Sequence, residues 1–516
     1  MADYDALIVG SGVNGLACGA LLAKAGWKVC VLERSDWFGG AIKTAEITEP
    51  GFRHDVFSAW HPLWVGGPAH AQLGDDLARH GLEYLNTDLP TGTLFPDGES
   101  AFLLRSAEAN TAELGAEWGP MLDGFLPNAD LAFGILGTEL RSRHAAGLGW
   151  KAVRRLGRRG AVDFAGRLLV SARDWLEQTF ASARTHGVIA PWVLHTGLGP
   201  EAAGSGYMAQ VIAVAVQEGG MPIPRGGSAK LADALVSYIR AQGGTCELGV
   251  HVERVSAGGV RTATGTKLTA ERAVICNVTP TQLYTQLLDG LDHHAHGFRY
   301  GRSEMQIHYA LSEPPRWAGD ERLGRTAIVH LTPGLDGVSR AVNEAERGLL
   351  PAEATVVVGQ PLTMDASRAP EGKGLLWIQL QELPWHVKGD AAGELDVAGG
   401  AWTESLREHY ADRIQARLAQ HIPNLEASIL ARTVLSPADL QAANVNLVHG
   451  DPYGGSLALD QSFLWRADHR TPVPGVWHIG ASTHPGPGLG GGSGALVAAQ
   501  LLEPPLAKRL AARFKR

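Results

Sequence analysis

The sequence contains little cysteine and no long hydrophobic run. Only four of its 516 residues are cysteines, and none forms a CxxC pair, so neither a disulfide framework nor a paired redox-cysteine motif is expected. No stretch approaches 18 continuous apolar residues, which excludes a membrane-spanning helix. The first residues enter a strand pattern without a charged region, an apolar region and a cleavage site. We therefore expect a cytoplasmic protein whose cysteines are reduced core residues.

A net positive charge is also lacking. The chain has 45 basic and 53 acidic residues, a formal net charge of −8, so no overall basic field attracts nucleic acid, and no nucleic-acid partner is expected. Hydrophobic residues make up 45% of the chain, which is typical of a large globular protein. Glycine is abundant, with 65 residues against a usual share of about 7%. This excess indicates tight turns or a backbone that lies close to a ligand.

The N-terminal segment follows a strand, glycine turn, helix, strand pattern. An apolar run over residues 6–9 stops at the turn 10–15, and an alanine-rich helical pattern continues to Gly26. A second apolar run, residues 28–32, ends at Glu33, 23 positions after Gly10. This is the spacing of a dinucleotide-binding βαβ unit in a Rossmann-like α/β fold.

Each residue type in this unit has a physical role in holding a dinucleotide. Gly10 makes the turn, Gly12 lets the backbone approach a pyrophosphate, and Gly15 permits close helix packing. Glu33 accepts hydrogen bonds from ribose hydroxyls and would repel a 2′-phosphate, which leaves FAD or NAD. A glycine pair shortly after the acidic residue favours FAD. The further residues expected to contact FAD here are Val13, Asn14, Arg34, Gly39 and Gly40.

These motifs carry a family resemblance. The segment 5–40, followed by Thr44 and by Gly-Phe-Arg-His-Asp at 51–55, resembles the N-terminal signature of the phytoene desaturase (carotenoid oxidoreductase) family of flavoproteins. That family usually carries arginine directly after the glycine pair, where this sequence has Ala41. Alanine at this position is a feature of the subgroup that resembles pyridine nucleotide-disulphide oxidoreductase domain-containing protein 2. A phosphate contact by that side chain is therefore not expected.

Two later segments extend the resemblance over nearly the whole chain. Residues 219–227 are followed by an amphipathic helical pattern over 229–242 and a strand pair, and residues 475–480 are followed by the glycine-rich loop 481–494 and a helical run. The resemblance implies that the backbone of Val252 contacts the adenine and that Gly480 lies near the pyrophosphate. It also implies that Leu489, Gly490 and Gly491 lie near the pyrimidine edge of the flavin.

The distribution of these segments predicts two discontinuous domains. Residues 1–95, 219–290 and 435–516 are expected to form the FAD-binding domain, of the glutathione-reductase-like Rossmann type. Residues 96–218 and 291–434 are expected to form an α+β substrate domain, with helices over 106–190 and strands at 305–310, 327–331, 355–358 and 375–380.

The resemblance and the residues together predict an FAD-dependent oxidoreductase, a dehydrogenase or desaturase of a small to medium lipophilic or alicyclic molecule. Hydride would pass to flavin N5, and oxygen or a quinone would reoxidise the flavin, because no second GxGxxG follows a strand. His61 and His484 are candidate proton acceptors, although each could be a packed, hydrogen-bonded histidine. No metal site is predicted. A flavin amine oxidase, an alkene saturase and an interaction or scaffold protein of the same fold, with or without FAD, remain alternatives.

A basic, apolar-interleaved segment lies between Arg141 and Arg173. It has nine basic residues and one acidic residue, Asp163, and its interleaved apolar residues include Leu148, Trp150 and Phe164. Carotenoid desaturases take lipophilic substrates from membranes through a similarly placed helical region. The segment is therefore either a peripheral membrane contact or a solvated basic helix. The sequence does not predict an oligomeric state.

Overall fold

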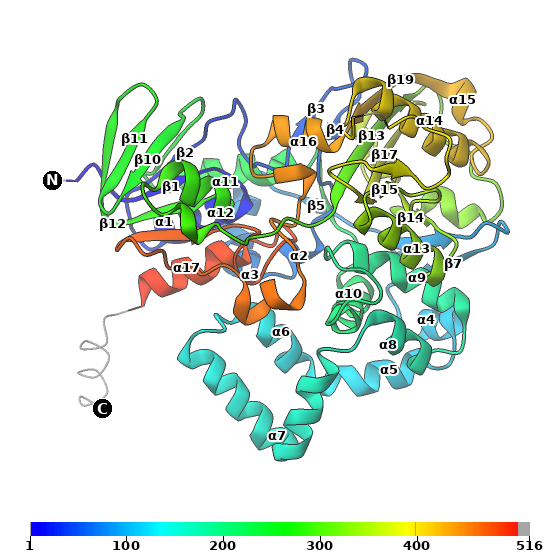
Figure 1. Ribbon diagram of the computed structural model, residues 1–516, viewed down its shortest axis with the longest axis horizontal. Coiled ribbons are helices and arrows are strands. Elements are labelled where there is room, and N and C mark those ends of the chain that lie inside the picture. Colours follow the sequence, from blue (N-terminus) through cyan, green and yellow to red (C-terminus); the bar gives the residue numbers. More distant parts are fainter. Residues whose placement is uncertain (1, 398, 504–516) are drawn as a thin grey trace.

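The computed structural model describes residues 2–397 and 399–503, and within them the chain forms two seven-stranded sheets (Figure 1). The predicted segment 435–516 thus extends beyond the described residues. The first sheet lies at the left of the view and the second at the upper right. A layer of helices lies below the second sheet, and the bent helix α7 projects from it. The predicted fold class, a Rossmann-like α/β unit combined with an α+β unit, is confirmed.

The first sheet is built on five parallel strands. In spatial order they are β20 (Val476–Ile479), β12 (Lys267–Asn277), β1 (Tyr4–Val9), β2 (Val29–Leu32) and β9 (Thr245–Glu247). The N-terminal half of β12 instead pairs antiparallel with β11 (Gly259–Thr262), which pairs with β10 (Val252–Ser256). The single long strand β12 therefore joins the parallel strands to the antiparallel ones.

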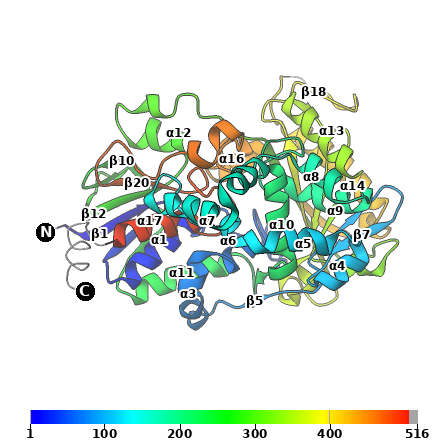
Figure 2. The same cartoon turned by 90° about the horizontal axis from the view of Figure 1, so that it is seen from below.

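Side chains of β1 alternate between two buried layers, as the period of a strand requires. Ala6 and Ile8 pack against one layer of helices, whereas Leu7 and Val9 pack on the opposite face against β10, β11 and the turn after α12 (Pro280–Gln282). The helices of the first layer are α1 (Val13–Lys24), α3 (Pro68–Arg79), α11 (Ala229–Ala241) and α17 (Gly492–Leu502). Figure 2 shows α1 and α17 side by side. Both faces of the parallel strands are therefore buried, which is typical of such sheets.

The second sheet is mainly antiparallel. Its strands in spatial order are β19 (Ile429–Leu435), β13 (Ser303–Leu311), β17 (Gly374–Leu383), β16 (Val356–Gly359), β14 (Ile328–Leu331), β6 (Thr91–Leu94) and β7 (Ser100–Leu103). Only β14 and β6 run parallel. The four strand segments expected between residues 305 and 380 all lie in this sheet, as β13, β14, β16 and β17.

The helices predicted over 106–190 are confirmed. They are α4 (Ala107–Leu114), α5 (Trp118–Phe125), α6 (Ala129–Gly137), α7 (Arg143–Arg167), α8 (Ala172–Thr179) and α9 (Ala183–Leu194), and α10 (Ser205–Gly219) follows them. Gly157 bends α7 with a φ of 73°. Helices α13 (Leu335–Glu346) and α14 (Glu404–Ala419) also pack on the second sheet.

The cysteines and the lengths of the helices can be compared with the sequence analysis. All four cysteines are free and buried, as expected of core residues. Among the described helices, none combines the length and the apolar character needed to cross a membrane. The predicted residue boundaries of the two domains stay a prediction.

Candidate functional site

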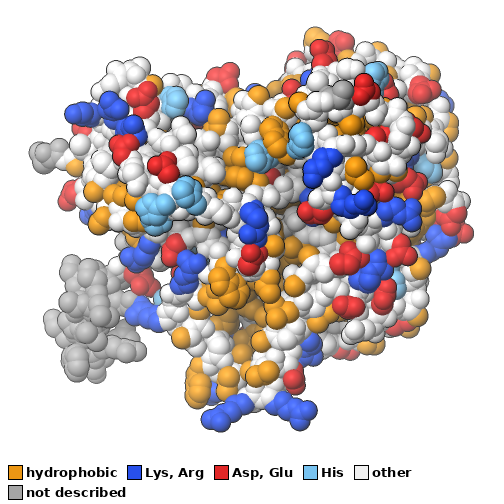
Figure 3. Space-filling view, in the orientation of Figure 1, with side chains coloured by type: hydrophobic (Ala, Val, Ile, Leu, Met, Phe, Trp, Pro, Cys, Tyr) orange, Lys and Arg blue, Asp and Glu red, His pale blue; other side chains and the backbone are white. Residues whose placement is uncertain are grey.

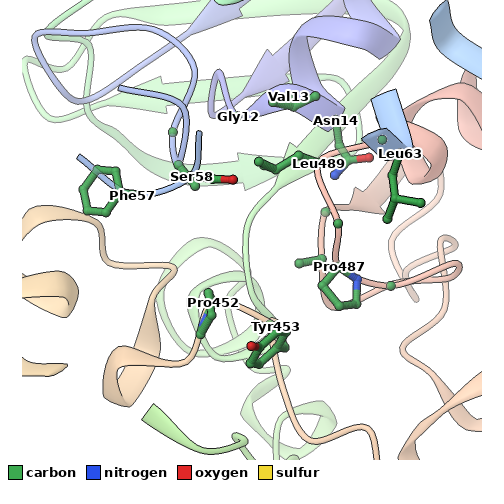
Figure 4. Close-up of a pocket in the computed structure, with 18 of the residues that line it drawn as sticks. Gly12, Val13, Asn14, Phe57, Ser58, Leu63, Pro452, Tyr453, Pro487 and Leu489 are labelled. Atoms are coloured by element: carbon green, nitrogen blue, oxygen red, sulfur yellow. The ribbon is translucent and has the colours of Figure 1, made fainter. Parts of the chain in front are cut away.

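One cavity of about 1160 Å³ extends from the first sheet to the second (Figure 4). On the side of the first sheet it is lined by the residues that directly follow β1, β2, β12 and β20. These are the carboxyl ends of neighbouring parallel strands, where ligands bind in open α/β sheets. On the other side it is lined by β13, β17 and α10. The two sheets thus contribute to a single continuous space.

The first glycine turn packs tightly against Asn277 at the end of β12. Gly10 has a φ of 91°, and a Cβ atom there would lie 2.8 Å from the carbonyl oxygen of Asn277. A Cβ on Gly12 would lie 2.8 Å from Asn277 Nδ2, and one on Gly15 would lie 2.3 Å from the Gly10 oxygen. A side chain would clash at both Gly10 and Gly15, so the backbone of the turn and the start of α1 can approach closely only with glycine at these positions. The turn also needs glycine because the amide of Asn277 fills the space beside it.

Glu33 is held in place by the same turn. Its carboxylate accepts hydrogen bonds from Ser11 N at 2.9 Å, Ser11 Oγ at 2.7 Å and Ser35 N at 2.9 Å. The side chain is buried, yet it lines the cavity. A carboxylate has about four acceptor positions, so one remains for a ligand hydroxyl. This donor set fits a ribose.

The glycine pair after Glu33 closes over the turn. Gly39 N donates a hydrogen bond to Ser11 O at 3.1 Å, and Gly39 has a φ of 111°. A Cβ on Gly40 would lie 3.1 Å from the Cα of Gly12. Both glycines line the cavity beside the turn, so a ligand here meets two stretches of bare backbone.

The C-terminal glycine loop brings a second helix N-terminus to the cavity. Helix α17 begins after Gly491, and Gly494 N donates to the Asn14 side-chain oxygen of α1 at 3.3 Å. A Cβ on Gly494 would lie 2.0 Å from Asn14 O, so α1 and α17 pack in close contact at their N-termini. Leu489 adopts a left-handed φ of 57° at the cavity wall. Two positive helix ends converge, which suits an anionic ligand such as a pyrophosphate.

The structure brings most of the predicted cofactor residues into one wall. Those that line the cavity are Gly10, Gly12, Val13, Asn14, Glu33, Arg34, Gly39, Gly40, Val252, Gly480, Leu489 and Gly490. Gly15 and Gly491 are not among the lining residues: Gly15 lets α1 lie against the first turn and Asn277, and Gly491 lets the start of α17 lie against α1 and α3. The assignment of each residue to a part of a cofactor stays a prediction.

The part of the cavity nearer the second sheet is mainly apolar. The rings of Trp60 and Trp377 pack edge to face at 5.2 Å between centroids. The other apolar side chains include Trp192 and, on α10, Met208, Val211 and Ile212. An apolar wall of this kind excludes water and accommodates a hydrocarbon skeleton.

A patch of polar side chains interrupts the apolar wall. Glu304 of β13 accepts hydrogen bonds from Tyr453 Oη at 2.9 Å and from Gln379 Nε2 at 2.6 Å. Gln381 Nε2 donates to Tyr453 Oη at 3.0 Å. Burial raises the pKa of Glu304 to about 8. A carboxyl group whose pKa is near neutrality, in a cavity wall, is suited to moving a proton.

Comparisons with known proteins agree with this geometry. A model described as an NAD(P)-binding Rossmann-like domain matches residues 8–77. The chain is 26% identical to pyridine nucleotide-disulfide oxidoreductase domain-containing protein 2 of Mus musculus, over 95% of this chain and 92% of that protein. It is 25% identical to the neurosporene-forming phytoene desaturase of Cereibacter sphaeroides, over 98% and 96% of the two chains.

The chain is thus similar to phytoene desaturases over nearly its whole length. Among solved structures, a putrescine oxidase bound to putrescine superposes with a TM-score of 0.62 at 18% identity, covering 97% of this chain and 99% of that one. This similarity shows that the fold is shared.

The two predicted catalytic histidines of this desaturase-like chain are not part of the cavity wall. His61 is buried, and its Nδ1 lies 3.0 Å from Tyr84 Oη. His484 Nε2 donates to the Ile135 carbonyl at 3.0 Å. Burial lowers the pKa of each imidazole to about 4. Their neighbours Trp60 and Pro485 line the cavity instead, so both catalytic roles stay predictions without support from this geometry.

Sequence reasoning missed Asn277 and the polar patch of the desaturase-like site. A signal for the patch was present, because Glu304 and Gln306 alternate with apolar residues in one strand segment, and Gln379 and Gln381 do so in another. Polar residues at every second position of a buried strand indicate a polar site on one face.

Proposed function

We propose that this desaturase-like chain binds FAD and dehydrogenates a lipophilic or alicyclic molecule. The observation that carries the proposal is the single cavity, which joins a dinucleotide-binding wall to an apolar wall without an intervening barrier. A cofactor and a substrate that share such a space lie in contact. When bound, FAD would supply the acceptor for a hydride.

The wall on the first sheet fits FAD in shape and in chemistry. Glu33 has one acceptor position left for a ribose hydroxyl, and the bare backbone at Gly12 and Gly40 lets a pyrophosphate approach. The N-termini of α1 and α17 would stabilise its negative charge. Val252 lies in the cavity wall together with Glu33, which supports an adenine contact.

The wall on the second sheet would hold the substrate. Trp60 and Trp377, packed edge to face, form part of an apolar surface, and α10 contributes further apolar side chains to the same cavity. Exclusion of water from such a site protects a reduced cofactor from side reactions. We propose oxygen or a quinone as the final electron acceptor, because no second strand followed by GxGxxG marks a nicotinamide site.

The absorption spectrum of the purified protein tests this function. The protein, incubated with FAD and desalted, is expected to show flavin bands that bleach on anaerobic reduction with dithionite and return in air. A protein that stays colourless after incubation would contradict FAD binding. Bands that do not bleach would contradict its redox role.

We also propose that the projecting helices contact a membrane surface. Trp150 and Val162 of α7 are 65% and 71% exposed, and exposed arginines flank them at 154, 158 and 159. Figure 3 shows apolar and basic side chains together at the lower end of the molecule, where α7 projects. Phe133 of α6 is partly exposed and also lines the cavity, so the cavity opens beside this region. Lys151 and Arg155 pair with Asp130 of α6, which neutralises part of the charge. An apolar surface flanked by basic residues fits an anionic lipid interface.

A further inference from the structure

The polar patch consists of Glu304 and Gln306 of β13, Gln379 and Gln381 of β17, and Tyr453 of a later loop. All five side chains line the cavity. The register pairs Gln306 with Gln379, so the two strands present their polar residues on the same face. A few convergent polar groups in an apolar cavity are what orients a ligand.

The hydrogen bonds of the patch fix which atoms act as acceptors. Tyr453 donates its only hydroxyl proton to Glu304, so it receives the hydrogen bond from the Gln381 amide nitrogen. The opposite end of the Gln381 amide, Oε1, is then left as an acceptor. In the same way Gln379 turns its nitrogen toward Glu304.

Two acceptors of the patch have no hydrogen-bond partner in the described structure. Both Gln306 Oε1 and Gln381 Oε1 are buried and unpaired. An unpaired buried acceptor costs roughly as much as a lost hydrogen bond, and each one needs an explanation. The patch therefore contains two unpaired amide oxygens and a carboxyl group just beneath the cavity surface, and a donor that enters from the cavity would pair with them after a small side-chain adjustment.

We propose that the patch binds a hydrogen-bond-donating group of the substrate, a carbon-bound hydroxyl or amino group, and that Glu304 accepts its proton during oxidation. This proposal rests on the proposed function. With FAD bound, the C–H bond next to the donor atom would break and FAD would accept the hydride. The O–H or N–H proton passes to the Glu304 carboxylate, and a C=O or C=N bond forms. In total the substrate loses two electrons and two protons. The hydride carries both electrons with one proton, and Glu304 takes the other proton.

The surroundings of Glu304 support this role. Burial raises its pKa to about 8, and the nearby Asp451 carboxylate acts in the same direction, whereas the hydrogen bonds from Tyr453 and Gln379 oppose the shift. Arg466, the charged residue across the cavity wall, is bound to backbone carbonyls of residues 453, 454 and 481. The reactive form of Glu304 is the ionised one, so its fraction increases as the pH rises through about 8.

Ligand binding to the FAD-loaded protein tests the donor preference. The probes are cyclohexanol and cyclohexyl methyl ether, which differ in whether the oxygen carries a proton, and cyclohexylamine and its N,N,N-trimethyl derivative. Calorimetry is expected to show that, in one of the two pairs, the compound that carries an O–H or N–H group binds at least tenfold more tightly than its methylated counterpart. Equal affinities within both pairs, or no binding of any probe, would overturn the proposal. The pair that shows the preference distinguishes a hydroxyl from an amine.

Glu304→Gln and Glu382→Gln form a matched pair of variants. Both glutamates are buried and have a raised pKa, but Glu382 lies on the other face of β17 and accepts from Thr355 N. E304Q is expected to bind FAD normally, to bind the preferred probe at least tenfold more weakly and to lose its donor preference. E382Q is expected to behave like the wild-type protein. Equal effects of the two variants would overturn the role of Glu304.

The reductive half-reaction gives a second readout. With the preferred probe class as reductant, anaerobic flavin bleaching is expected to accelerate as the pH rises through about 8, to level off above it, and to slow at least 100-fold in E304Q. A pH profile unchanged in E304Q would overturn the proton transfer. A wild-type protein that binds no FAD would instead contradict the proposed function, so the two failures are distinguishable.

Discussion

The carboxylate of Asp55 and the guanidinium of Arg368 form a completely buried ion pair at 2.9 Å, although they lie 313 positions apart in the sequence. Asp55 also accepts hydrogen bonds from Ser228 N and Ser228 Oγ, each at 2.8 Å, and from Thr44 Oγ1 at 2.8 Å. The pair thus connects the N-terminal segment, the start of α11 and the loop before β17. It does not line the cavity, so it holds these segments together rather than acting on a substrate.

Removing one partner of this pair is expected to destabilise the protein strongly. Asp55→Asn leaves the buried Arg368 without its counter-charge, and the free energy of unfolding should fall by about 3–5 kcal/mol. Urea denaturation measures the change. The control is Asp88→Asn, because Asp88 is 98% exposed and its contact with Arg105 is 3.9 Å long, so it should change stability by less than about 1 kcal/mol. Equal effects would show that burial of the pair is unimportant.

Gly15→Ala is expected to damage the dinucleotide wall. Its Cβ would lie 2.3 Å from a backbone oxygen that cannot move without shifting the turn. The free energy of unfolding should fall by about 1–3 kcal/mol, and the Kd for FAD, measured by flavin fluorescence, should rise at least tenfold. Gly166→Ala in α7 is the matched control, since nothing lies within 4 Å of its Cβ position. This helical substitution should be neutral or slightly stabilising, and FAD binding should be unchanged.

Gly359→Ala is expected to narrow the substrate part of the cavity. The new methyl group would lie 2.1 Å from Cη2 of Trp60, so the indole must move. FAD content should be unchanged while ligand affinity falls at least tenfold, as titration calorimetry can measure. The double variant Gly359→Ala/Trp60→Phe removes the clashing atom and should recover at least part of the affinity. If the double variant did not regain affinity, the clash with the Trp60 ring would not be the cause of the loss.

The stability of the protein is expected to depend on pH through Glu304. Its folded-state pKa is raised from 4.5 to about 8, so between these values the folded protein keeps a proton that the unfolded chain has released. The free energy of unfolding therefore falls as the pH rises through this window. Glu304→Gln removes the ionisation, and its stability relative to wild type should improve by roughly 3–4 kcal/mol between pH 5 and pH 8. A constant difference, measured by thermal unfolding at both pH values, would show that Glu304 ionises normally.

The projecting helices are expected to mediate binding to lipid. Trp150→Ser combined with Val162→Ser should reduce sedimentation with anionic phosphatidylglycerol vesicles about tenfold and leave FAD binding intact. Leu430→Ser is the control, because Leu430 is 47% exposed on β19 of the second sheet. If both variants reduced vesicle binding equally, or if the wild-type protein did not bind vesicles, the membrane contact would be contradicted. The interpretation of α7 as a solvated basic helix would then hold.

The dinucleotide wall was predictable because its geometry is local. At Gly10 and Gly39 the backbone adopts a positive φ, and the strand and helix beside each glycine motif lie within a few residues of it. The sequence therefore predicted β1, α1, β20 and α17 together with their order. The wall formed by Glu304 was not predicted, because it depends on the register of β13 with β17 and on Tyr453, 149 positions away.

The two histidines show why the direction of a loop side chain could not be predicted from the sequence. His61 and His484 were chosen by residue type and by their place near the predicted cofactor, and both lie in segments that contribute to the cavity wall. A one-residue step along an irregular segment turns a side chain away from the cavity, so Trp60 and Pro62 line it whereas His61 packs against Tyr84. Side-chain direction in a loop follows from tertiary packing, which the sequence pattern does not encode.

The central position of β12 has a consequence for how the protein is made. Its C-terminal half pairs with β1 on one side and with β20 on the other, and β20 precedes the helix whose N-terminus meets that of α1. During synthesis, β1 and β12 emerge from the ribosome some 200 residues before β20. Until then the nascent chain has an unpaired edge on β12 and an uncovered face of α1, and the cavity wall lacks its C-terminal glycine loop. The cavity wall at the carboxyl ends of the parallel strands is therefore complete only after residues 476–502 have been synthesised and have packed against β12 and α1.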